Sequence, residues 1–230
     1  MSKFLKIGHR GACGHEPENT LRSIKKALEL SVDMIEFDVY VCKSGGLVVI
    51  HDDTVNRTTN GTGYVTEMTF EELRKLDAGK GEKIPTLQEA LDLINGKVQV
   101  NIELKGVGTA LPVAKTINEY TTKHPGVWTP EHFLVSSFNH FELRAFKQAM
   151  PGIKIGALIC GMLTTRAQFA QDLGAYSVNP SIEFLDQEFV DDAHRRGLKV
   201  FVYTVNLPED IERMKAWGVD GVFSNFPYRL

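Results

Sequence analysis

The feature that most constrains the fold is a repeated alternation between short apolar runs and longer amphipathic segments. Eight runs have the length and β-branched content of strands, and seven segments have a helical period. The strand candidates are 4–9, 34–41, 98–104, 132–138, 153–159, 175–180, 198–205 and 221–224. The helix candidates are 17–31, 86–95, 110–123, 139–149, 164–173, 186–196 and 208–217. Strand followed by helix, repeated in this way, predicts parallel pairing.

Two architectures share this periodicity, the closed eight-stranded β/α (TIM) barrel and the doubly wound open sheet. We predict the α/β class with an eight-stranded parallel barrel, because eight units in 230 residues suit a single core. The barrel forms one domain over residues 1–230. The run LVVIHD at 47–52 extends the second strand unit, and residues 53–85 are polar and rich in Thr and Gly. We therefore expect a small insertion at approximately 47–85.

Composition and charge exclude several classes of function. The net charge is -3 and no long run of Lys and Arg occurs, which argues against a nucleic-acid partner. No segment approaches 18 unbroken apolar residues and the N-terminus lacks an apolar signal region, so we expect no membrane span and a cytoplasmic location. Cys13, Cys42 and Cys160 lack the spacing of zinc or redox sites, which predicts inert thiols.

Acidic side chains occur near the ends of two predicted strands. Glu36 and Asp38 are two apart in EFDV, and Glu103 lies in NIELK, so all three should point into one cleft at the barrel mouth. Carboxylates that converge in a cleft repel each other and need a compensating cation. Oxygen ligands without cysteine or clustered histidine favour magnesium, calcium or manganese over zinc. The sequence thus predicts one divalent cation and leaves its identity open.

Basic groups end the first strand and the LVVIH run. His9 and His51 reach the same mouth and could supply a general base and a general acid, since imidazole titrates near neutrality. Arg10 is suited to a phosphate oxygen, because guanidinium forms bidentate bonds. Glu18 and Asn19 precede a helix, where they either cap it or orient the site.

At this point the residues match a known family. The matching motifs, in chain order, are HRG at 9–11, PENT at 17–20, EFDV at 36–39, HD at 51–52, RTT at 57–59, LDAG at 76–79, IPTL at 84–87, IELK at 102–105 and SSF at 136–138. The chain resembles the glycerophosphodiester phosphodiesterases, in particular the short cytoplasmic bacterial type. This resemblance runs almost from end to end.

The resemblance implies a β/α barrel with an inserted segment and a small-molecule substrate. The implied reaction hydrolyses deacylated phospholipids, such as glycerophosphocholine or glycerophosphoethanolamine, to sn-glycerol 3-phosphate and an alcohol. One histidine activates the glycerol 2-hydroxyl, the other protonates the leaving alcohol, and water opens the cyclic phosphate. By this resemblance Glu36, Asp38 and Glu103 match the metal ligands, His9 and His51 the acid-base pair, and Arg10 and Lys105 the phosphate contacts.

Two departures from the family pattern affect substrate preference. Tyr203 in VYTVN stands where relatives often carry Trp, and Asn225 in SNFP stands where they often carry Asp. We expect neither residue to touch the metal or acid-base residues. Phe138 and Tyr203 would line the glycerol side of the pocket; alternatively, both are barrel core.

Two rival functions remain open. A related enzyme acting on a lysophospholipid would need an apolar lip, and the polar insertion shows none. A non-catalytic phosphate binder normally lacks a histidine or a carboxylate, yet the predicted set is complete. The sequence also leaves open the head group, the order of the two histidines, the oligomeric state, with a homodimer as one option, and the choice between phosphate scavenging and lipid turnover.

Overall fold

The structure, a computed structural model, describes residues 3–230 and contains a closed β-barrel. The strands of the structure are β1 (Leu5–Gly8), β2 (Met34–Val41), β3 (Leu47–Val49), β4 (Gln99–Leu104), β5 (Phe133–Ser137), β6 (Lys154–Ile159), β7 (Ser177–Pro180), β8 (Lys199–Val202) and β9 (Gly221–Ser224). Strand β1 pairs in parallel with both β2 and β9, which closes the ring. This closure confirms the barrel and excludes the open sheet. Strand β3 lies outside the ring, antiparallel to β2.

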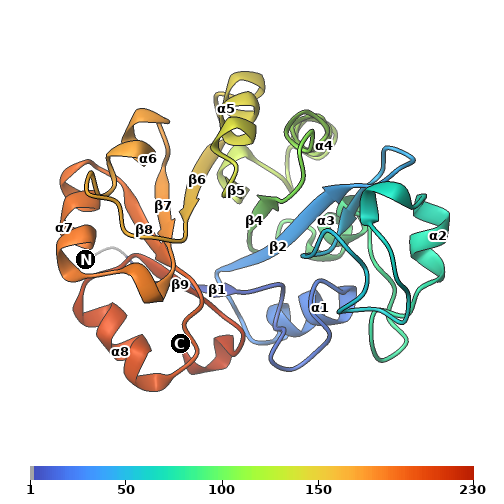
Figure 1. The fold of residues 1–230 in the computed structure, drawn as a ribbon, viewed down its shortest axis with the longest axis horizontal. Coiled ribbons are helices and arrows are strands. Elements are labelled where there is room, and N and C mark those ends of the chain that lie inside the picture. The colour runs from blue at the N-terminus through green and yellow to red at the C-terminus, as the bar shows by residue number, and fades with distance from the viewer. Residues whose placement is uncertain (1–2) are drawn as a thin grey trace.

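Helices surround the barrel (Figure 1). They are α1 (Leu21–Glu29), α2 (Phe70–Lys75), α3 (Leu87–Ile94), α4 (Ala110–Lys123), α5 (His140–Ala149), α6 (Gln168–Asp172), α7 (Gln187–Arg195) and α8 (Pro208–Ala216). Short 3₁₀ helices are η1 (Val65–Glu67), η2 (Pro130–His132), η3 (Ile182–Phe184) and η4 (Pro227–Arg229). Within residues 3–230, no helix has the length and apolar character that crossing a membrane requires.

Two predicted helix starts lie several residues too early. The side chain of Thr20 accepts the N–H of Ser23, so α1 begins at Leu21 rather than at residue 17. Asn19 has a φ of 59° and lies outside the helix. Helix α6 begins at Gln168 rather than at 164, with no side-chain cap before it. The helix predicted from 86 begins at Leu87, because Thr86 is the N-cap of α3.

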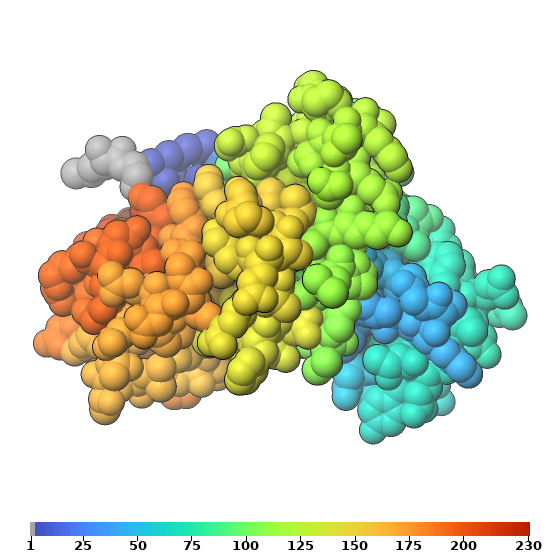
Figure 2. Space-filling view, turned by 90° about the horizontal axis from the view of Figure 1, so that it is seen from above, coloured from blue at the N-terminus to red at the C-terminus, as the bar shows by residue number. Residues whose placement is uncertain are grey.

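The inserted segment has a small hydrophobic core of its own. Buried side chains in this core include Val48, Val55, Val65 and Leu73. The segment also contains α2, a helix that the sequence reading missed, although Thr69 and Glu72 form a capping box there. In the space-filling view the insertion, coloured cyan, stands out at one end of the molecule (Figure 2).

Strand alternation separates two environments on β2. Phe37 points outward into the core between barrel and helices and is fully buried. Glu36 and Asp38, one residue to either side, therefore point into the barrel. Inside the barrel an apolar layer made of Ile7, Met34, Leu134, Phe201 and Phe223 closes the floor below them.

Truncation of Phe37 to alanine should destabilise the barrel strongly. Its side chain is fully buried, so Phe37→Ala loses apolar burial and leaves a cavity, at a cost of about 3–5 kcal/mol. Urea unfolding measures this difference. Phe141→Ala, at a side chain that is 79% exposed, is the matched control and should change stability by less than about 0.5 kcal/mol. Equal losses in the two variants would contradict the assigned orientation of β2.

Candidate active site

A cleft of about 210 Å³ opens at the carboxyl ends of the barrel strands. Its lining combines charged groups from β1, β2 and β4 with aromatic and aliphatic groups from later strands. The lining residues are His9, Arg10, Glu36, His51, Asn101, Glu103, Lys105, Phe138, Leu158, Tyr203, Thr204 and Phe223. The structure thus brings the predicted acidic, basic and aromatic residues to one mouth, which is where β/α barrels carry their active sites.

Three buried carboxylates lie together in this cleft. One oxygen each of Glu36, Asp38 and Glu103 lies within 4.8 Å of the others, and their exposed fractions are 2%, 1% and 9%. Burial and the neighbouring Asp38 charge raise the pKa of Glu36 well above its usual range and that of Glu103 to about 7. Atom Oε1 of Glu36 has no hydrogen-bond partner. The donor set fits a hard divalent cation.

The loop after β1 is shaped to present its backbone to these acids. Arg10 has a φ of 50°, and its N–H donates to Oε2 of Glu36 at 2.8 Å. Gly11 has a φ of +82°, and a Cβ there would lie 2.4 Å from the hydroxyl of Ser23. Only glycine fits such a position without strain. The need for glycine therefore comes from packing against α1.

The two predicted phosphate contacts flank the acids as cations. The Nζ of Lys105 lies 2.9 Å from Glu103 and 3.9 Å from Asp38. Nε of Arg10 lies 3.6 Å from Asp38. Both cations lie with their acids in the same cleft, so the site holds mixed charge.

His9 is held by an amide. Its Nδ1–H donates to Oδ1 of Asn225 at 2.6 Å, which leaves Nε2 as the unprotonated atom. Burial, followed by the charge of Arg10, lowers the pKa of His9 to about 4. We expected Asn225 to lie away from the acid-base residues, and this was wrong. The last strand ends beside the first one in a closed barrel, so the two residues meet although 216 positions separate them.

His51 is held by a carboxylate. Its Nδ1–H donates to Asp52 at 2.6 Å, and Lys105 donates to its Nε2 at 3.2 Å. Arg57 in turn donates to Asp52 at 2.7 and 2.9 Å, and this bonding holds the pKa of Asp52 below its usual range. A charged carboxylate stabilises an imidazolium more strongly than a neutral amide oxygen does. The two histidines therefore differ in chemistry.

The residues before α1 contact the site rather than the helix end. Asn19 donates its side-chain N–H to Asp38 at 2.8 Å. Glu18 accepts from Arg10 at 2.8 Å and from two nitrogens of Arg57, also at 2.8 Å. Thr20 caps α1, so Glu18 and Asn19 do not, and both contact charged groups of the site instead.

Two aromatic residues line the same cleft as the acids, and Nζ of Lys105 lies 5.7 Å from the ring centre of Phe138. Phe138 and Tyr203 pack edge to face with their ring centres 5.7 Å apart. Phe138 is 43% exposed, and the hydroxyl of Tyr203 donates to the carbonyl of Ile159 at 2.9 Å. Phe138 is thus a wall of the cleft, which disfavours the alternative that it is plain core.

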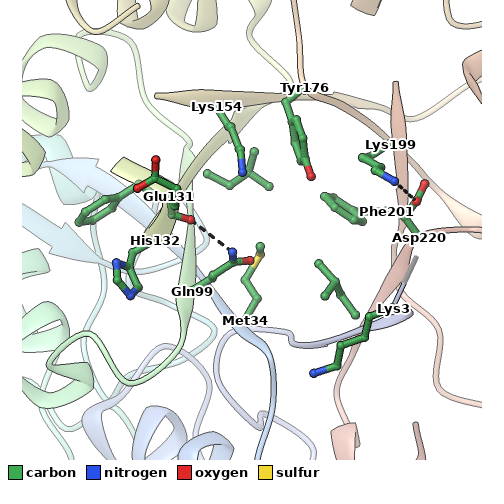
Figure 3. Close-up of a pocket in the computed structure, with 13 residues that line it drawn as sticks. Lys3, Met34, Gln99, Glu131, His132, Lys154, Tyr176, Lys199, Phe201 and Asp220 are labelled. Atoms are coloured by element: carbon green, nitrogen blue, oxygen red, sulfur yellow. Dashed lines mark hydrogen bonds and ion pairs between the residues drawn. The ribbon is translucent and has the colours of Figure 1, made fainter. Parts of the chain in front are cut away.

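A second cavity lies at the other end of the barrel, where the strands begin. It measures about 250 Å³, and Lys154, Tyr176 and Lys199 stand around it (Figure 3). Lys199 pairs with Asp220 at 2.7 Å, and Lys154 lies over the ring of Tyr176. The acidic cluster lies at the opposite end, so this cavity is not the candidate active site.

Comparisons with known proteins agree with this site. Residues 9–229 match the model of the glycerophosphoryl diester phosphodiesterase family. The glycerophosphodiester phosphodiesterase of Caldanaerobacter subterraneus is 43% identical, over 99% of this chain and 96% of that protein. One from Bacillus subtilis is 32% identical, over 98% and 84%. A phosphodiesterase from Oleispira antarctica, solved with its product sn-glycerol-3-phosphate, has a TM-score of 0.87 and 32% identity, over 97% and 93%.

A closed β/α barrel with an acidic cluster and two histidines at its mouth suits the hydrolysis of charged esters. The chain belongs to the glycerophosphoryl diester phosphodiesterase family, and its activity is that of a glycerophosphodiester phosphodiesterase.

Replacing Asn225 by aspartate should change the protonation of His9. A carboxylate at the 2.6 Å contact adds a negative charge, so the pKa of His9 should rise from about 4 toward its ordinary value. A pH titration of the histidine ring signals by NMR measures the shift. Asn118→Asp, at an exposed position on α4, controls for the added charge. An unchanged His9 titration in Asn225→Asp would contradict the contact.

Proposed function

We propose that the chain hydrolyses small glycerophosphodiesters with one divalent cation and two histidines of opposite role. Glycerophosphocholine and glycerophosphoethanolamine are the proposed substrates, and sn-glycerol 3-phosphate and the free alcohol are the products. The observation that carries this proposal is the convergence of three buried carboxylates, two histidines and two cations in one cleft.

Glu36, Asp38 and Glu103 are the proposed ligands of the cation. The unpartnered Oε1 of Glu36 and the raised pKa values of Glu36 and Glu103 support this, because both features disappear when a positive charge binds there. When bound, magnesium, calcium or manganese would act as a Lewis acid toward a phosphoryl oxygen.

The partners of the two histidines support an order of roles. His9 is neutral and its Nε2 is free to accept a proton, so we assign it as the base that takes the proton of the glycerol 2-hydroxyl. His51 can be stabilised as imidazolium by Asp52, so we assign it as the acid that protonates the leaving alcohol. The roles then reverse as water opens the cyclic phosphate. Each transfer contributes roughly a hundred- to ten-thousand-fold.

The two cations and the aromatic wall would position the substrate. Arg10 and Lys105 offset the charge of the phosphodiester, which grows in the transition state. Lys105 turning to the phosphate would free Nε2 of His51 for the leaving oxygen. Phe138 and Tyr203 would contact the carbon chain of glycerol, which needs an apolar surface. The product bound by the Oleispira antarctica relative supports a glycerol phosphate in such a site.

The cytoplasmic location and the homodimer remain predictions from the sequence. Cys13, Cys42 and Cys160 are free thiols, which supports a reducing compartment such as the cytoplasm. The homodimer is untested.

Activity should depend on both the metal and the histidines. After EDTA treatment we expect no release of glycerol 3-phosphate from glycerophosphocholine or glycerophosphoethanolamine, and recovery with magnesium, calcium or manganese. His9→Ala and His51→Ala should each lower kcat about 10²- to 10⁴-fold with little change in KM. His124→Ala, at an exposed site after α4, should be unaffected. Cleavage of lysophosphatidylcholine alone, or full activity in EDTA, would refute the proposal.

Removing one carboxylate should stabilise the metal-free protein. The pKa of Glu103 is about 7 when folded and ordinarily about 4.5, so the metal-free fold loses stability as pH rises between these values. Glu36→Gln removes a buried carboxyl group whose charged form the metal-free site disfavours, so its melting temperature at pH 7 should exceed that of the metal-free wild type. Added metal should raise the wild-type value only.

Calorimetry measures both effects, with Glu71→Gln at an exposed site on α2 as the control. A Glu36→Gln protein that is less stable than the wild type, or equally stabilised by metal, would count against the cation site.

A further inference from the structure

Exposed hydrophobic side chains lie along one side of the barrel mouth. They come from the three consecutive loops β4–α4, β5–α5 and β6–α6 and from the helix starts that follow. We call this set the apolar rim: Val107, Leu111, Phe138, Phe141, Met162 and Leu163. Within residues 3–230 it holds the three most exposed large hydrophobic side chains, Val107 at 86%, Phe141 at 79% and Leu111 at 64%. Such a concentration marks an interaction site.

Hydrogen bonds hold the rim in this exposed arrangement. The carboxylate of Glu142 accepts the N–H groups of Gly108 and Ala110, each at 2.9 Å, and so ties the β4–α4 loop to the first turn of α5. On the other side, Nε2–H of His140 donates to the carbonyl of Leu158 at 2.9 Å. Val107 and Phe141 therefore lie on neighbouring segments that are fixed to each other.

The rim is continuous with the active-site cleft. The βα loops of a parallel barrel all lie at the carboxyl ends of the strands, the same end as the acids. Phe138 belongs to both features, since it lines the cleft and is 43% exposed. Whatever covers the rim therefore also faces the mouth.

Cationic side chains stand behind the apolar tips. Lys115 is exposed one helical turn after Leu111, and Arg144 is exposed one turn after Phe141. The guanidinium of Arg144 lies 5.8 Å from the ring centre of Phe141. The carboxylate of Glu142, the acid between them, is occupied by backbone N–H groups. From the barrel mouth inward along α4 and α5, the exposed side chains are therefore first apolar and then cationic.

We propose that the apolar rim binds an anionic phospholipid surface and turns the mouth of the enzyme toward it. Apolar tips followed by cations match the order of acyl boundary and phosphate headgroups that an interfacial protein meets. A stable protein partner takes roughly 20–30 residues a side, whereas the rim has six. The binding goes beyond the proposed hydrolysis and is independent of it. The apolar lip absent from the insertion is thus present on the β4–α4, β5–α5 and β6–α6 loops.

The test is sedimentation of the full chain with vesicles of phosphatidylcholine, with or without phosphatidylglycerol. The wild type should bind the phosphatidylglycerol vesicles. The variant Val107→Ser/Leu111→Ser/Phe141→Ser should bind at least about tenfold more weakly, since it loses most of the buried apolar area. Lys115→Gln/Arg144→Gln should weaken binding about fivefold per cation, and only where phosphatidylglycerol is present.

Two controls keep the result specific. Val127→Ser changes a hydrophobic residue that is 36% exposed at the other end of the barrel and should bind as the wild type does. Hydrolysis of soluble glycerophosphocholine should stay within about twofold in every variant, since none of these residues lines the cleft; this assay reports the proposed function separately.

Three results would overturn the proposal. These are no wild-type binding to phosphatidylglycerol vesicles, equal binding by the triple variant, or a wild-type dimer that the triple variant converts to monomer in the absence of vesicles.

Discussion

Mutual repulsion among three buried carboxylates is the constraint on which the rest of the site depends. Because the oxygens lie within 4.8 Å of one another, each pair of like charges would cost at least roughly 3 kcal/mol at an effective dielectric constant of about 20. The fold offsets part of this cost with the cations Arg10 and Lys105 and with the amide of Asn19. Burial, followed by the charge of Asp38, accounts for the raised pKa values of Glu36 and Glu103. A cluster of this kind makes physical sense as a receptor for positive charge.

Barrel geometry lets the fold hold such a cluster without giving up its hydrophobic core. Strand alternation on β2 sends Phe37 to the outer core and the two acids inward, so one strand serves stability and chemistry together. Closure between β1 and β9 then brings the last strand beside the first loop. This brings Asn225 into hydrogen-bond contact with His9. The insertion supplies Arg57, which binds Asp52, the hydrogen-bond partner of His51. The two histidines thus receive different partners from distant parts of the chain.

The sequence predicted what depends on local pattern. Strand and helix alternation was enough for the barrel, and the i, i+2 spacing was enough to aim Glu36 and Asp38 into it. It could not predict contacts that arise only from closure, and the Asn225 expectation failed for that reason. The sequence assigned no role to Arg57 of the RTT motif. Its partners, Glu18 and Asp52, come from two separate segments that only the fold brings together. The apolar rim was missed because single exposed residues on three loops form no pattern along the chain.

The most direct test of this account is anomalous diffraction from crystals of the chain grown with manganese. The account predicts one manganese peak at the mouth, with oxygens of Glu36, Asp38 and Glu103 at about 2.0–2.6 Å from it. It further predicts Nε2 of both histidines on the side of the cleft that faces the ion. A crystal without a peak between these carboxylates, or with the ion bound elsewhere in the chain, would contradict the central claim that the acids form a cation site.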